Sequence, residues 1–141
     1  MVIDASVWTS AILATDGHHA VTTQWLAVVR KSHSSAWVPA HFPAEVIGAI
    51  RRVGAQSRTI QHELDWIFHG PFFEISVIDN ALALLAAQVA ERSALRGSDA
   101  IYVALAGWLQ LPLISWNREQ RERGEMFCRT MSPIEAMALN E

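Results

Sequence analysis

Cysteine, lysine and long apolar runs are nearly absent from this sequence of 141 residues. Cys128 is the single cysteine, so no disulfide can form within the chain, and a reducing compartment is expected. The most apolar stretch, residues 81–90, is interrupted by Gln88 and falls well short of the roughly 20 residues that a membrane span needs. The first cationic side chain is Arg30, which does not fit a secretory signal. We therefore expect a cytoplasmic protein with no membrane partner.

Charge is also scarce, at 18% of the residues, and the net charge is −3 with a pI near 6.0. Proteins that bind nucleic acid through their overall charge are usually basic, so the net charge argues against this class. An enzyme that contacts nucleic acid through a local patch is not excluded. Apolar residues make up 51% of the chain, which suits one globular domain over residues 1–141 and argues against disorder.

Several common catalytic motifs are missing. The sequence has no glycine-rich phosphate loop and no Gly-x-Ser-x-Gly motif, and His62 lacks the second histidine of a zinc-protease helix. A haloacid-type phosphatase needs Asp-x-Asp, but Asp4 is followed by Ala5-Ser6. A receiver-like domain needs a lysine after a late strand, whereas Lys31, the only lysine, comes early. These classes are therefore not favoured.

Short apolar runs alternate with helical patterns along the chain. Such alternation predicts an α/β fold whose mainly parallel central sheet of four to five strands is flanked by helices on both faces. Strands are predicted at residues 2–3, 37–39, 73–77, 113–115 and 127–129. Helices are predicted at residues 6–13, 19–30, 43–53, 56–69, 80–93 and 98–109, with a capped final helix starting near residue 132.

Three acids lie near the predicted strand ends, where the active sites of such sheets are usually found. Asp4 follows the first strand, Glu45 lies in the first helical turn after the second strand, and Asp99 is the one charge in the apolar helix 98–109. Each has a structural alternative: Asp4 can cap a helix, and Glu45 and Asp99 can complement a helix dipole, with Ser98 as a cap. Together they favour a carboxylate cluster beyond the strand ends. Such a cluster is typical of a Mg²⁺ site for phosphodiester hydrolysis.

The sequence resembles the PIN domains, and in particular the VapC-type toxins of VapBC toxin–antitoxin modules. The resemblance rests on Met-Val-Ile-Asp-Ala-Ser at the start and on a glutamate in the first turn of the helix after the second strand. It also rests on Ser-Asp-Ala-Ile-Tyr-Val-Ala-Leu-Ala from Ser98 and on Ser-Trp-Asn-Arg-Glu from Ser115. These segments span essentially the whole chain in matching order. They imply a three-layer, Rossmann-like PIN fold and a metal-dependent endoribonuclease.

The resemblance also assigns roles and partners. Asp4, Glu45 and Asp99 match the first three acids of the family, which hold Mg²⁺ or Mn²⁺ so that a water can attack an RNA phosphate. Asp4 and Asp99 are the metal ligands in this assignment, and Ser115 matches a hydroxyl residue that supports the site. The implied partners are the RNA substrate, a second copy in a homodimer, and a VapB-type antitoxin that holds the toxin inactive.

Asn117 departs from the family pattern, in which a fourth acid often lies two residues after the supporting hydroxyl. An asparagine keeps an oxygen but removes a charge, so metal should bind more weakly unless Glu119 reaches the site. Asn117 can also serve simply as a helix N-cap. Arg118 and Arg121, beside the site, either contact RNA phosphate or form a solvated helix face. The alternative hypothesis is a catalytically weak or inactive PIN-like protein that acts through antitoxin or RNA binding.

Overall fold

Val2 and Ile3 form β1, the central strand of the sheet, and both side chains are fully buried. The computed structural model describes residues 1–32 and 34–139. Within them, one five-stranded sheet has the order β3-β2-β1-β4-β5, and every pairing is parallel. The strands are β1 (Val2–Ile3), β2 (Ala36–Pro39), β3 (Phe73–Ser76), β4 (Leu113–Ile114) and β5 (Thr130–Met131). The predicted α/β fold with a parallel sheet is confirmed.

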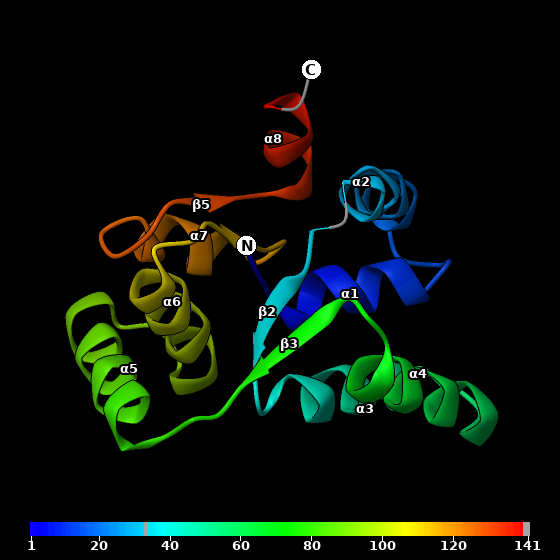
Figure 1. Ribbon diagram of the computed structural model, residues 1–141, viewed down its shortest axis with the longest axis horizontal. Helices are drawn as coiled ribbons and strands as arrows, with labels where there is room; N and C mark the ends of the chain where they lie inside the picture. The colour runs from blue at the N-terminus through cyan, green and yellow to red at the C-terminus, as the bar shows by residue number, and fades with distance from the viewer. Residues whose placement is uncertain (33, 140–141) are drawn as a thin grey trace.

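Helices cover both faces of the sheet, which gives three layers (Figure 1). In the described residues they are α1 (Ala5–Ile12), α2 (His19–Lys31), α3 (Phe42–Arg52), α4 (Ser57–His69), α5 (Asn80–Ser93), α6 (Gly97–Leu109), α7 (Arg118–Gly124) and α8 (Pro133–Ala138). Figure 1 shows α5 and α6 on one side and α1, α3 and α4 on the other. Because both faces are covered, the central strands β1 and β4 consist of buried apolar residues alone. None of the helices in these ranges has the length and hydropathy of a membrane span.

α6 is apolar almost all round because it lies between α5 and strands β1, β2 and β4. Tyr102, at its centre, is fully buried. The helix begins at Gly97 and its N-cap residue is Arg96, whose side chain makes no capping bond, so the predicted Ser98 cap is wrong. The first turn of α6 brings Asp99 to the edge of the sheet where the strands end.

The fifth strand lies at Thr130–Met131, and its predicted position at residues 127–129 is wrong. The predicted segment belongs to the turn after α7, where the backbone N–H of Phe127 donates to the carbonyl of Gly124 at 2.9 Å. Its apolar pattern has another cause, because the Phe127 ring packs against the core under the guanidinium of Arg92, 5.2 Å from the ring centroid.

α7, a helix that the sequence patterns did not delimit, lies close against α6. The close approach depends on Gly124. A Cβ at this position would lie 3.0 Å from Cγ2 of Val103 and 3.2 Å from Cγ2 of Thr130, tighter than ordinary van der Waals contact. Glycine thus lets α7 approach α6, and this sets the position of the α7 side chains relative to Asp99.

Candidate active site

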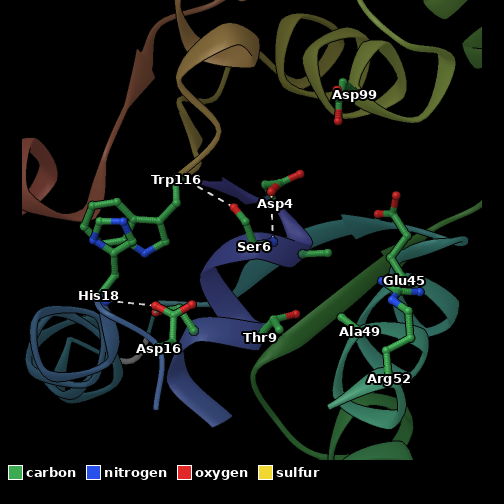
Figure 2. A pocket seen from close by; sticks show the side chains of 12 residues that line it. Asp4, Ser6, Thr9, Asp16, His18, Glu45, Ala49, Arg52, Asp99 and Trp116 are labelled. Carbon is green, nitrogen blue, oxygen red and sulfur yellow. Dashed lines mark hydrogen bonds between the residues drawn. The ribbon is translucent and has the colours of Figure 1, made fainter. Parts of the chain in front are cut away.

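A pocket of about 560 Å³ opens beyond the carboxyl ends of the central strands (Figure 2). It is lined by Asp4, Ala5, Ser6, Thr9, Ser10, Asp16, His18, Glu45, Ala49, Arg52, Asp99 and Trp116. Figure 2 shows Asp99 and Glu45 extending from different helices toward the space beside Asp4. The three acids singled out in the sequence therefore share one pocket, although 41 and 54 residues separate them along the chain.

Asp4 comes directly after β1 and is only 6% exposed. Its Oδ2 accepts a hydrogen bond from the backbone N–H of Ser6 at 2.9 Å, so Asp4 is the N-cap of α1. Its Oδ1 accepts a bond from the side-chain amide of Gln120 at 3.3 Å. The cap therefore occupies one oxygen and leaves the second facing the other site residues, so the two predicted roles of Asp4 are compatible.

Glu45 lies in the first turn of α3 and is half-buried. Burial raises its pKa, a hydrogen bond from Tyr102 opposes this, and repulsion by Asp4 adds to it. That bond runs from the Tyr102 hydroxyl to Oε2 at 2.6 Å. His41 Nε2 lies 3.5 Å from the same oxygen without hydrogen-bond geometry, and burial lowers the His41 pKa despite the pull of Asp4 and Asp99. Tyr102 is thus the group that orients the Glu45 carboxylate.

Asp99 has a strongly raised pKa. Burial, followed by repulsion from Asp4 and Glu45, raises its pKa from 3.8 to about 6. Arg96 acts in the opposite direction but more weakly. Three carboxylates that repel one another are costly in a half-buried pocket, and their combined charge attracts a cation.

Gln120 links two of these acids and was not singled out from the sequence. It is fully buried, and its Nε2 donates to Oδ1 of Asp4 at 3.3 Å and to the backbone carbonyl of Asp99 at 3.2 Å. Its Oε1 has no hydrogen-bond partner among the described residues. Tyr102 was also missed, although its spacing of three residues from Asp99 places both on one face of α6 and was a usable signal.

The PIN domain family matches residues 1–125. The chain belongs to the PIN domain family. Among solved structures, FitAB bound to the IR36 DNA fragment is similar with a TM-score of 0.71 and 14% identity, covering 94% of each chain. FitAcB from Neisseria gonorrhoeae is similar with a TM-score of 0.72 and 13% identity, covering 94% of this chain and 97% of that chain. At these identities the likeness shows the PIN fold. Among curated proteins, none matches this sequence.

In this PIN domain, Asn117 is the N-cap of α7, and its side-chain oxygen is used for the cap while its amide nitrogen faces Asp99. Its Oδ1 accepts the backbone N–H of Gln120 at 3.1 Å, which makes it the N-cap of α7. Its Nδ2 donates to Oδ2 of Asp99 at 3.4 Å. Ser115 is fully buried and its Oγ accepts the backbone N–H of Asn117 at 2.9 Å, so this hydroxyl shapes the loop that carries Asn117.

The charged side chains of α7 lie outside the lining of the PIN domain pocket. Glu119 pairs with Arg123 at 2.9 Å and is exposed, although its charge still contributes to the raised pKa of Asp99. Arg118 pairs with Glu122 at 2.6 Å. Arg121 donates to the carbonyl of Ser115 at 2.7 Å. The roles predicted for Glu119, Arg118 and Arg121 therefore require these contacts to change when a ligand binds.

The carboxylate oxygens of this PIN domain are suitable ligands for a hard cation, but the acids that carry them are not closely spaced. Carboxylate oxygens are the ligands that Mg²⁺ and Mn²⁺ favour, and the mutual repulsion at Asp99 is the kind that a divalent ion relieves. Within residues 1–32 and 34–139, no three His, Cys, Asp or Glu side chains are gathered closely enough to hold an ion. Mg²⁺ commonly uses one or two carboxylates and several waters, so two acids suffice.

Proposed function

We propose that this PIN domain is a metal-dependent endoribonuclease, the toxin of a VapBC-type toxin–antitoxin module. PIN domains are generally nucleases that use divalent metals. The observation that carries the proposal is the shared pocket of Asp4, Glu45 and Asp99, with the pKa of Asp99 raised to about 6. A carboxylate cluster of this kind at the strand ends suits hydrolysis of an anionic phosphodiester with a cation as mediator.

Asp4 and Asp99 are the residues that would hold Mg²⁺ or Mn²⁺, because each presents an oxygen whose present partner is a weakly held amide. Such an ion supplies charge neutralisation at the phosphate and lowers the pKa of a bound water. Glu45 is the proton acceptor in this proposal. Tyr102 fixes its Oε2, and Oε1 remains available to accept a proton from a water in the pocket.

The second candidate is the catalytically weak or inactive PIN-like protein, and Asn117 and Gln120 favour it. Their amides contact Asp99 and Asp4 at 3.4 and 3.3 Å and so partly satisfy the two acids without a metal ion. The site holds one acid fewer than a four-acid PIN site. Both features lower the gain from metal binding, and in this case the protein would act through its antitoxin or RNA.

The deciding experiment is cleavage of RNA with Mg²⁺ or Mn²⁺ by the wild type and by Asp4→Asn. Asparagine keeps a capping oxygen for α1 but removes the charge, so the fold is retained. Asp65→Asn is the matched control, because Asp65 is exposed on α4 and forms an exposed ion pair with His69. We expect cleavage by the wild type and the control only. Equal cleavage by Asp4→Asn would reject the mechanism, and none by any protein would favour the second candidate.

We also propose a cytoplasmic homodimer that binds a VapB-type antitoxin. An acid pocket in which the described residues offer few cations attracts an arginine from a partner, and such charge-assisted bonds are strong. The similar structure of FitAB was determined with a DNA fragment. Light scattering after gel filtration should give twice the 15.7 kDa chain mass. A monomer mass at micromolar concentration would argue against the dimer.

A further inference from the structure

His18 and Trp116 lie face to face at one rim of the acid pocket. Their ring centroids are 3.9 Å apart and the ring planes differ by 9°. Both residues line the same pocket as the three acids, and Figure 2 shows the pair on one side of Asp4, with Glu45 and Arg52 on the other side. The two rings come from different parts of the chain, the turn before α2 and the loop after β4.

Trp116 is held rigidly by its hydrogen bonds. Its Nε1 donates to Oγ1 of Thr22 at 2.9 Å, and its backbone N–H donates to Oγ of Ser6 at 3.1 Å. The Thr22 hydroxyl in turn donates to the carbonyl of His18 at 2.8 Å. The indole is therefore tied to α2 and the Trp116 backbone to α1, and the ring cannot swing away without breaking its bond to Thr22. It follows the supporting residue Ser115 directly in the chain.

His18 is fixed from the other side. Its backbone N–H donates to Oδ1 of Asp16 at 2.8 Å, and the same oxygen accepts the hydroxyl of Ser10 at 2.9 Å. One face of the imidazole stacks on Trp116, and the residue is otherwise exposed to solvent. With its backbone anchored and its ring stacked on Trp116, the imidazole is preorganised and loses little conformational entropy when a planar ligand stacks on it.

We propose that the His18–Trp116 pair is a stacking platform for one unpaired nucleobase next to the scissile phosphate of an RNA substrate. This proposal rests on the ribonuclease function proposed above. Proteins read RNA mainly through unstacked bases laid on aromatic side chains, and base–aromatic stacking needs no particular sequence. A base in a duplex is covered by its neighbours and is not available to the platform.

Arg52 indicates the direction in which an RNA strand would cross the pocket. It lies at the end of α3, on the opposite side from His18, and its guanidinium lies over Gly48, where an added Cβ would be 3.3 Å from Nη1. A strand with a base on His18 and a neighbouring phosphate at Arg52 carries its backbone over Asp4. Arginine binds phosphate through two parallel bonds, which suits this end of the path.

The test measures binding of RNA without cleavage, in the Asp4→Asn background, by fluorescence anisotropy. The probes are a short single-stranded RNA, the same RNA with one abasic position moved along it, and its duplex. His18→Ala should weaken binding of the single strand by roughly 5- to 150-fold, the range for loss of one stacked base. His18→Phe should restore most of the affinity. His69→Ala, an exposed histidine on α4, is the matched control and should bind like the background.

The abasic series distinguishes stacking from a structural effect of the substitution. One abasic position should weaken binding by the background protein and leave binding by His18→Ala unchanged. Equal losses at every position in both proteins, or an equal effect of His18→Ala on duplex RNA, would overturn the platform. The outcome is independent of the proposed chemistry, because a protein that shows the abasic pattern but never cleaves RNA retains the platform and loses only the nuclease function.

Discussion

Replacing Asp99 with asparagine should stabilise the metal-free protein at neutral pH. Burial and the neighbouring Asp4 and Glu45 raise the folded-state pKa of Asp99 from 3.8 to about 6. The folded state therefore holds its proton more tightly than the unfolded state does. Below about pH 4 the carboxyl group is mostly protonated in both states and opposes folding little. Its cost in the free energy of unfolding grows as the pH rises from the unfolded pKa of 3.8 to the folded pKa of about 6, and it is constant above about pH 7.

The size of this effect follows from the same pKa values. Two pKa units correspond to about 3 kcal/mol, and the half-exposed position of Asp99 reduces this by solvent screening to about 1–2 kcal/mol at pH 7.5. Asparagine lacks the charge and can keep a hydrogen bond with Asn117. The gain in the free energy of unfolding for Asp99→Asn should therefore be absent near pH 4 and complete by pH 7.5.

Urea unfolding followed by tryptophan fluorescence between pH 4 and 8 measures this gain, with Asp65→Asn as the exposed control. Adding Mg²⁺ should make the wild type more stable to urea than Asp99→Asn. The ion stabilises only the folded state that binds it, and the variant has lost a proposed ligand. An Asp99→Asn protein that is less stable than the wild type at pH 7.5, or equally affected at every pH, would refute the reasoning.

Three further substitutions test other parts of the site. Asn117→Asp keeps the α7 cap and adds a charge, so calorimetric titration should show Mg²⁺ affinity increased on the order of tenfold, and equal or weaker affinity would count against the assignment. Tyr102→Phe removes the 2.6 Å bond to Glu45 and should lower kcat roughly 10- to 100-fold at unchanged RNA affinity. Gly124→Ala should cost about 1–3 kcal/mol in the free energy of unfolding, measured in urea, because the added methyl meets Val103, and an unchanged midpoint would contradict the close approach of α7.

The centre of the sheet was predictable from the sequence because its strands are buried on both faces. Val2-Ile3 and Leu113-Ile114 are apolar pairs, each followed directly by a polar residue, and all four side chains are buried. The fifth strand was misplaced because Phe127 is apolar for another reason, its packing against the core under Arg92. Helix α7 itself is short, polar and defined mainly by the cap at Asn117, which leaves little hydrophobic periodicity to detect.

The acids of the site were predictable because a charge beside a buried strand or helix is energetically costly unless it has a partner or a function. Asp4 and Asp99 both interrupt apolar segments, and both line the pocket. Gln120 could not be found in this way, since a glutamine in a polar helix looks ordinary. Its contact with Asp4 spans 116 positions in the chain and exists only because α7 lies against α6. Whether Asp4, Glu45, Asp99 and Asn117 are catalytic stays a prediction.

The position of β1 in the middle of the sheet affects when the pocket can form during synthesis. β1 pairs with β2, which is made early, and with β4, which is made late. The roughly 75 residues between Glu45 and Gln120 take about 4–15 s to translate at 5–20 residues per second. Until then Asp4 has neither β4 beside it nor Gln120 against it. The acid pocket is therefore complete only after the last third of the protein has been made, so a nascent chain on the ribosome would lack the proposed nuclease site.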